Sequence, residues 1–139
     1  MNIFLHFFKR KKIHTLKDPV FGPLTFENKV WVFLPNSEFR EFMITVDAPQ
    51  EGPSHEQRDF FQRISLHLPE YETKAREYIK SRAEPHPEVD ALSIYSVEIE
   101  NVALTSREEF VLELADAEAT EIHRVSFRRG ECIDYGVDD

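Results

Sequence analysis

The sequence predicts an α+β protein in which a mostly antiparallel sheet of about six strands packs on one long, kinked helix. Two observations lead to this fold class. Short segments of alternating apolar and polar residues lie on both sides of one long segment with helical spacing. The strand-like segments follow one another across short polar connections, as in an antiparallel meander. The predicted order is three strands, a helix and three or four further strands.

Three strands are predicted before the helix. The first covers 20–26 and is interrupted by Gly22-Pro23, which indicates a bulge or an edge position because proline cannot donate to a central ladder. Asn28-Lys29 then fits a two-residue turn. The segment 30–34 is apolar without a gap and is expected to be buried on both faces. The segment 41–47 alternates between apolar and polar residues, which predicts the third strand.

The helix begins with a capping box, because Ser54 is followed three residues later by Gln57. Pro69 lies outside the apolar stripe, so it would bend the helix from the solvent side. We therefore expect one kinked helix over 54–82, with two helices meeting near Leu68 as the alternative. The residues expected to face the sheet are Phe60, Phe61, Ile64, Leu68, Tyr71, Ala75, Tyr78 and Ile79.

The strands after the helix are predicted from clean alternation. They cover 92–100, 110–114, 122–128 and 132–137, and Arg129-Gly130 forms the tight turn of a terminal hairpin. Within the first of these strands, three residues are expected to share one face. They are Tyr95, Val97 and Ile99.

Composition places the chain among folded globular proteins. Its 139 residues fit one domain, and 41% hydrophobic and 31% charged residues are ordinary values for such a domain. Twelve phenylalanines against one tryptophan predict a core built on Phe. For Trp31 and Phe33 two positions stay open, the core or an exposed aromatic patch. The single cysteine, Cys132, excludes an internal disulfide framework and a multi-cysteine zinc site.

Charge divides the chain into two parts. Residues 1–17 hold five of the 17 basic residues and none of the 26 acidic ones, so the remainder is strongly acidic although the net charge is −9. We interpret 1–17 as a basic and apolar N-terminal tail and 18–139 as a single α+β domain. An acidic domain repels nucleic-acid phosphates, which argues against DNA or RNA as a partner. Its charge either maintains solubility or attracts a basic partner.

The sequence predicts no transmembrane segment, because no run approaches the roughly 18 apolar residues that a spanning helix needs. The apolar residues of 1–8 precede the basic cluster, the reverse of the order in a signal peptide, so we expect a cytoplasmic protein. Two roles for the tail stay open. It either contacts an anionic membrane surface or docks its Phe side chains on the domain or on a second copy, so a homodimer is one arrangement that the sequence allows.

No catalytic, cofactor-binding or metal-binding constellation is recognisable. Cys132 has no signature of a nucleophile, and the six histidines are scattered without the His-x3-His spacing of a helical metal site. Carboxylate pairs such as Glu98 with Glu100 arise by chance among 26 acids. The four glycines form no phosphate-binding loop. We therefore expect no cofactor and, as the first interpretation, no enzymatic activity.

Several stretches together resemble a family of small uncharacterised bacterial proteins, a domain of unknown function. They are the segment Asp18-Pro19-Val20-Phe21-Gly22-Pro23-Leu24, Trp31, the segment Gly52-Pro53-Ser54-x-x-Gln57, and the end Tyr135-Gly136-Val137-Asp138-Asp139. Some relatives of this kind are suspected toxin-immunity proteins. The resemblance covers roughly 18–139 and implies a shared fold, and it brings no catalytic residues with it.

The leading functional hypothesis is a non-enzymatic protein-interaction module. It is immunity-like and binds a basic partner, such as a toxin, through an acidic surface. The residues predicted to contact that partner are acids of the late loops: Glu108, Glu109, Asp116, Glu118 and Glu121. The alternative is a small hydrolase or ligand-binding domain with a cleft between helix and sheet.

Overall fold

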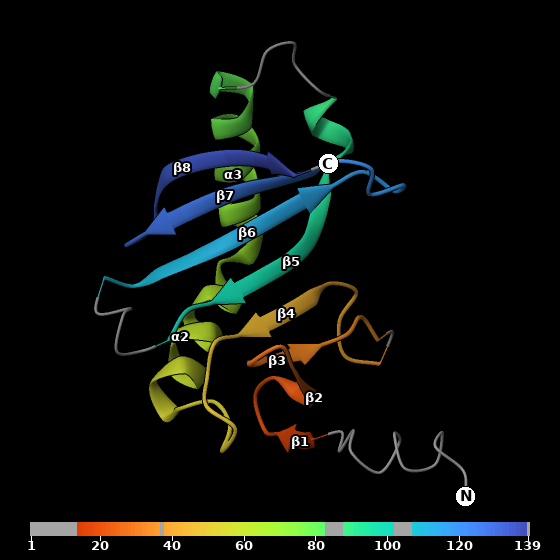
Figure 1. Ribbon diagram of the computed structural model, residues 1–139. Coiled ribbons are helices and arrows are strands. Elements are labelled where there is room, and N and C mark those ends of the chain that lie inside the picture. The colour runs from red at the N-terminus through yellow and green to blue at the C-terminus, as the bar shows by residue number, and fades with distance from the viewer. Residues whose placement is uncertain (1–13, 37, 83–87, 102–106, 139) are drawn as a thin grey trace, which may run out of the picture.

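The computed structural model describes residues 14–36, 38–82, 88–101 and 107–138, and it places them around one mixed sheet of eight strands (Figure 1). The strands lie side by side in the order of the sequence. They are β1 (His14–Asp18), β2 (Gly22–Glu27), β3 (Val30–Phe33), β4 (Met43–Val46), β5 (Ser93–Ile99), β6 (Glu109–Ala115), β7 (Ile122–Arg128) and β8 (Glu131–Asp138). The helices are α2 (His55–Leu66), α3 (Leu68–Arg82) and the short 3-10 helix η1 (Val89–Ala91).

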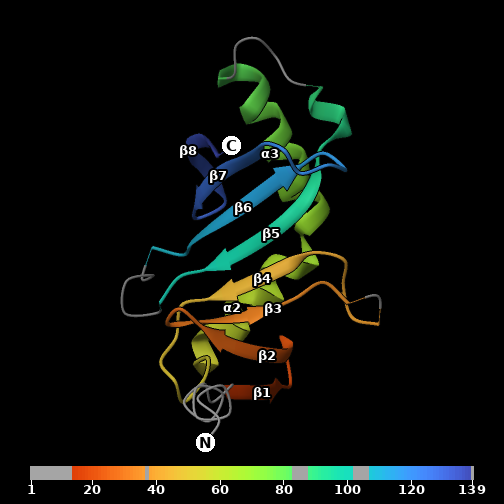
Figure 2. The same cartoon turned by 45° about the vertical axis from the view of Figure 1, so that its right-hand side comes forward.

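Strand pairing divides the sheet into two antiparallel halves. Neighbours are antiparallel from β1 to β4 and again from β5 to β8. The halves meet at β4 and β5, which are parallel. The chain between these two strands forms α2 and α3, which return it to the edge of the sheet where β4 begins, so that β5 runs in the same direction as β4 (Figure 2).

The predicted fold class is therefore wrong in its main features. The sheet is mixed and has eight strands, where about six mostly antiparallel strands were expected. Two short helices replace the single long, kinked helix. The strand that the sequence missed, β1, includes residues 14–17, which were assigned to the N-terminal tail because of their basic composition. Residues 1–13 lie outside the described part.

The helical segment is interrupted at His67. This residue leaves the helical region with φ −121° and ψ 18°, and its N–H bonds the carbonyl of Ile64 at the end of α2. Pro69 then falls in the first turn of α3, where its missing N–H breaks no helical hydrogen bond. The chain therefore adopts the alternative interpretation, in which two helices meet near Leu68.

The predicted start of the helix is confirmed. Ser54 Oγ accepts from the Gln57 N–H, and Gln57 Oε1 accepts from the Ser54 N–H, which together form a capping box. Gln57 does more than the motif requires, because its Nε2 donates to the carbonyls of Asp47 and Glu100 at 2.8 Å each. This buried carboxamide therefore ties the N-terminus of α2 to the chain directly after both β4 and β5.

The two expected tight turns are also confirmed. Asn28 and Lys29 have φ of 50° and 69°, and Arg129 and Gly130 have φ of 49° and 81°. Positive φ at both central residues is the conformation of the two-residue turn that matches the twist of a hairpin.

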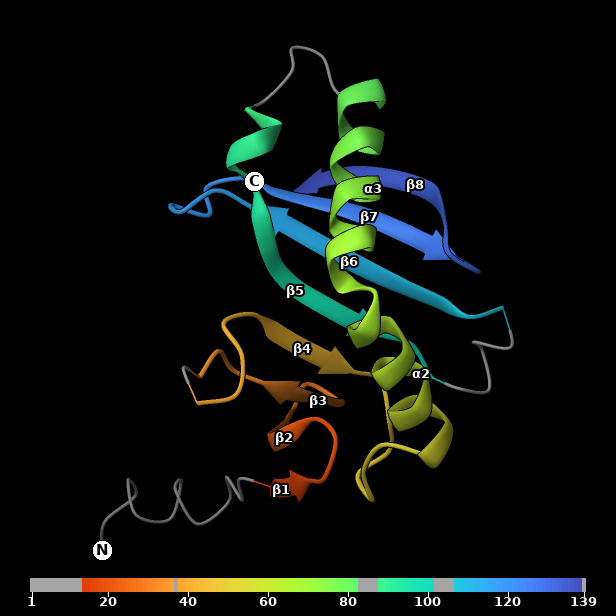
Figure 3. The same ribbon diagram turned by 180° about the vertical axis from the view of Figure 1, so that it is seen from behind.

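Both helices pack on the same face of the sheet, as Figure 3 shows. The residues predicted to face the sheet do so, since all eight belong to the core or pack against it. The core is rich in phenylalanine, and Trp31 belongs to it with its Nε1 donating to the Pro49 carbonyl at 2.8 Å. The largest fully buried aromatic side chains are Phe21, Phe33, Phe110 and Phe127.

Among the described residues, no helix combines the length and the apolar character that crossing a bilayer demands.

Candidate protein-binding face

The two faces of the sheet differ in composition, as two neighbouring rows of paired residues show. On the face that the helices cover, one such row crosses all eight strands and is mainly apolar. It consists of His14, Phe26, Trp31, Val46, Ile99, Phe110, Phe127 and Cys132. The neighbouring row points the other way and is mainly polar. It consists of Thr15, Thr25, Val32, Thr45, Glu98, Val111, Ser126 and Asp134.

We call the second face the open face, because neither α2 nor α3 lies on it (Figures 1 and 3). A sheet with one covered face and one polar face follows from strict alternation along each strand. The side chains that point away from the helices are thus the ones left for a partner.

A charged cluster occupies the centre of the open face. Arg124 on β7 donates from Nη1 and Nη2 to the two carboxylate oxygens of Glu98 on β5, both at 2.8 Å. Its Nη1 also donates to Glu113 on β6 at 2.6 Å, and Ser96 Oγ donates to the other oxygen of Glu113. The Asp138 carboxylate lies 3.8 Å from Arg124 Nε. We call Ser96, Glu98, Glu113 and Arg124 the ladder, since they link three neighbouring strands.

The ladder is built for structure rather than for proton transfer. Ser96 is fully buried and Glu113 is 7% exposed, although no helix lies over them. Both carboxylates bond the same guanidinium, and these bonds raise the pKa of Arg124, the hydrogen bond with Glu98 contributing most. General acid/base catalysis by a carboxylate pair needs a carboxyl group that is free to exchange its proton with a substrate, whereas here both carboxylates are hydrogen-bonded to the same guanidinium.

Negative charge accumulates where the parallel strands end. Desolvation raises the pKa of the Glu100 carboxyl, and the charges of Glu98, Asp47 and Glu109 raise it further. Glu109 itself pairs with Arg128 at 2.7 Å. Acids therefore outnumber bases at this end of the open face, which would attract cationic side chains.

At the opposite end, the sheet contains a notch. The pairing of β4 with β5 begins at Met43 and Ser96, so β5 residues 93–95 extend beyond β4 without it as a neighbour. The gap forms a cavity of about 330 Å³. Its lining is mainly apolar and consists of Leu34, Pro35, Glu41, Met43, Ser93, Ile94, Tyr95, Ala115 and Asp116.

A β-bulge supplies the central aromatic of the notch. The pairing of β5 with β6 shifts between Ile94 and Ser96, which leaves Tyr95 as the additional residue. Bulges redirect side chains, and this one moves Tyr95 off the face of Val97 that alternation predicts. Tyr95 is consequently 41% exposed, where the sequence placed it with the core residues.

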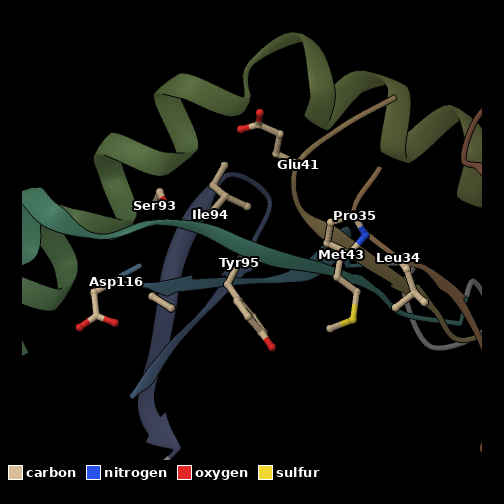
Figure 4. Close-up of a pocket in the computed structure, with 9 residues that line it drawn as sticks. Leu34, Pro35, Glu41, Met43, Ser93, Ile94, Tyr95 and Asp116 are labelled. Carbon is tan, nitrogen blue, oxygen red and sulfur yellow. The ribbon is translucent and has the colours of Figure 1, made fainter. Parts of the chain in front are cut away.

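The notch combines exposed apolar groups with two acids. Leu34 is 63% exposed, and Figure 4 shows Leu34, Met43 and Tyr95 pointing to the same side of the sheet. Asp116 lies at one end of the notch, and Glu41 lies on the side of the helices (Figure 4). An apolar pocket beside carboxylates is suited to an apolar side chain that has cationic neighbours.

Two of the predicted contact residues lie at the start of β6. Glu108 is exposed and pairs with Arg63 of α2 at 3.1 Å, and Glu109 pairs with Arg128. Both are thus already engaged by cations within the chain.

The other three predicted contact residues lie around the turn after β6, at its far end. Asp116 accepts from the N–H groups of Glu118 and Ala119, which fixes the turn. Glu121 is exposed, with its carboxylate 3.7 Å from Nε2 of His123. The five predicted acids therefore form two groups separated by the length of β6, and only Asp116 lines the notch. Their role in partner binding stays a prediction.

Sequence reasoning missed the residues that shape the open face, above all Glu113, Arg124 and Tyr95. A signal exists for the first two, because Glu113 lies between Leu112 and Leu114, and Arg124 precedes Val125 at an outward position of a predicted strand. For Tyr95 no signal exists, since its spacing from Val97 and Ile99 is that of an ordinary strand.

The groups with potential for metal or thiol chemistry lie elsewhere. Cys132 Sγ contacts the Lys74 carbonyl at 3.8 Å, and burial raises the pKa of this thiol, which disfavours the nucleophilic thiolate. His123 is buried, with its Nδ1 2.8 Å from the Tyr135 hydroxyl. Within the part of the chain that the structure describes, no three His, Cys, Asp or Glu side chains come together as metal ligands.

Comparison of the chain with protein-family models, with curated proteins and with solved structures gives no match.

Proposed function

We propose that this chain is a non-enzymatic protein-interaction module that binds a basic protein through its open face. The observation that carries the proposal is the notch, where Leu34 and Tyr95 are exposed on the same side of the sheet and Asp116 lies at one end. Apolar anchors that enter a pocket supply most of the affinity of protein interfaces, and complementary charge supplies orientation and speed of association.

The distribution of charge favours a basic partner over a neutral one. At the end of the face away from the notch, Glu100 experiences the negative charges of Glu98, Asp47 and Glu109. A basic partner that spans both ends would place an apolar side chain in the notch and Lys or Arg near these acids. In the immunity-like form of this proposal, which rests on the sequence resemblance alone, the partner is a bacterial toxin.

Selection from a library of random peptides tests the apolar part of the proposal. We expect the peptides retained by the immobilised protein to combine Lys or Arg with a large apolar residue. Replacing the anchors, as in Leu34→Ser with Tyr95→Ser, should weaken binding of a selected peptide by about tenfold or more. Val137→Ser is the matched control, because Val137 is 44% exposed on the edge strand β8, lines neither cavity and should leave the affinity unchanged.

The electrostatic part has a separate test. Raising the salt concentration from about 0.05 to about 0.5 M should weaken the selected peptide, since exposed charges are screened. Asp116→Asn, which removes the charge and keeps the Oδ1 acceptor of the turn, should weaken it as well, whereas Glu56→Gln, an exposed acid on α2, should not. Selected peptides without enriched basic residues, or equal binding by the double Ser variant, would contradict the proposal.

A further inference from the structure

A second cavity lies between α2 and the turn that joins β1 to β2. Its volume is about 530 Å³, within the range of sites for small ligands. Aromatic and aliphatic side chains line it together with one cation. The lining consists of Pro19, Val20, Arg40, Phe61, Gln62, Ser65 and Leu66.

The position of Arg40 is fixed from two directions. Its guanidinium carbon lies 4.6 Å from the ring centre of Phe33 and 5.5 Å from that of Phe61. Its Nη1 and Nη2 donate to the carbonyls of Phe21 and Val20. Rings and carbonyls thus hold the cation in place, but they do not neutralise its charge.

No carboxylate balances this cation within the described residues. Arg58, on the neighbouring helix, shows the contrast, because it pairs with the buried Asp18 at 2.7 Å. None of the ion pairs among the described residues includes Arg40, and desolvation lowers its pKa. A half-buried guanidinium without an anion is costly, and an anionic ligand would remove that cost.

The larger part of the cavity lining is apolar. Leu66 is 79% exposed at the C-terminal end of α2, and Val20 is half-buried beside it. Phe61 also lines the cavity, and the centre of its ring lies 4.9 Å from that of Phe21. Such walls favour a ligand with an apolar body over a strongly hydrated anion such as phosphate.

We propose that this cavity binds a carboxylate attached to a small apolar group. The planar guanidinium of Arg40 matches a carboxylate with parallel hydrogen bonds, and Phe61 and Leu66 contact the apolar group. Either a free small carboxylic acid or the C-terminal carboxylate of a peptide carries this chemistry. The inference is independent of the open face, because the cavity is lined by α2 and not by any residue of the notch.

The experiment titrates the full isotope-labelled chain with two matched pairs of probes. The first pair is 4-methylpentanoate and its neutral amide. The second is acetyl-Ala-Leu with a free C-terminus and the same peptide with an amidated C-terminus. At least one carboxylate probe should shift the NMR signals of the Arg40 Nε–H and the Gln62 carboxamide in a saturable way, with a dissociation constant on the order of 1 mM.

The comparison of probes identifies the source of the carboxylate. Tighter binding of the free acid assigns the cavity to small carboxylic acids, and tighter binding of the peptide assigns it to C-termini. Both neutral probes should bind about tenfold more weakly than their charged partners. The proposal is overturned if neither carboxylate saturates the signals at about 20 mM, or if an amide binds as tightly as its carboxylate.

Variants separate binding from folding. Arg40→Lys keeps the charge but loses the planar fork, so the affinity should fall about tenfold. Because Arg40 also holds the turn after β1, Leu66→Asp provides an independent test at an exposed position, and it should abolish detectable binding through repulsion. Val137→Asp, at an exposed position on β8 that lines neither cavity, should bind like the parent. Unchanged affinity in Leu66→Asp would refute the assignment.

Discussion

At the scale of single residues, Glu100 is a carboxyl group that the fold makes harder to ionise. Desolvation and the charges of Glu98 and Asp47 raise its pKa above the ordinary value of 4.5. The folded chain then binds this proton more tightly than the unfolded chain. The contribution of Glu100 to stability is accordingly most favourable below pH 4.5, and it is lost as the pH rises through the raised pKa.

The variant Glu100→Gln tests this effect, because it removes the charge and keeps the shape. We expect it to raise the melting temperature at pH 7, with the difference from the parent shrinking towards zero at about pH 4. Glu27→Gln, an exposed acid on β2, is the control. Thermal unfolding across this pH range measures both. A gain that is independent of pH would show that the charge of Glu100 is not its cause.

Tyr95 shows why a residue can be misassigned from sequence. Its spacing from Val97 and Ile99 has the period of a strand, and alternation therefore assigns all three to one face. A bulge inserts one residue without changing the composition of the strand, so the sequence gives no warning of it. The error matters, because it concerns the aromatic residue at the centre of the notch.

At the scale of elements, the interruption of the helical segment is another limit of periodicity. The apolar positions keep one phase through His67 because both helices lie along the same face of the sheet. Phase alone therefore cannot separate a kinked helix from two helices. Pro69 is the distinguishing residue, since its place in a first turn is favourable and its place in a helix interior is costly.

Elements with strict local signals were predictable. The strand β7 has the predicted bounds 122–128, and its alternation is complete along its length. The capping box and both two-residue turns depend on neighbours in the sequence and were found for that reason. By contrast, β1 lies in a basic segment with little alternation, and only its pairing with β2 makes it a strand.

Gln57 links α2 to the sheet, so replacing it tests how the connection between β4 and β5 is held in place. Gln57→Ala removes one partner of the capping box and leaves the carbonyls of Asp47 and Glu100 without their donor. We expect a loss of about 3 kcal/mol in the free energy of unfolding. Urea denaturation measures it, with Gln62→Ala on the exposed side of the same helix as the control, expected within about 0.5 kcal/mol. Equal losses in both variants would contradict this role.

At the scale of the whole molecule, the register across the sheet decides which acids become neighbours. Glu98 and Arg124 are 26 residues apart in the sequence and meet because β5, β6 and β7 pair with Ser96, Glu113 and Arg124 in one line. Glu109 and Asp116 are close in sequence but lie at opposite ends of β6. Net charge predicted an acidic surface, whereas its arrangement depends on pairings that no local pattern specifies.

We therefore expect the ladder to contribute to the stability of the whole sheet. Replacing Arg124 tests this contribution. Arg124→Met leaves Glu98 and the nearly buried Glu113 facing each other without a cation. We expect a loss of about 2 kcal/mol in the free energy of unfolding, measured by urea denaturation. The control is Arg63→Met, because the exposed pair of Arg63 with Glu108 should contribute less than about 1 kcal/mol.

A rescue experiment distinguishes lost attraction from uncompensated charge. Replacing both acids in the same chain, as Glu98→Gln and Glu113→Gln with Arg124→Met, removes the repulsion that the single variant creates. If unpaired carboxylates cause the loss, the triple variant should be more stable than Arg124→Met alone, although neither salt bridge is present in it. If the triple variant is less stable instead, the carboxylates stabilise the strands even without the guanidinium, and the hydrogen bond from Ser96 to Glu113 is the contact through which they do so.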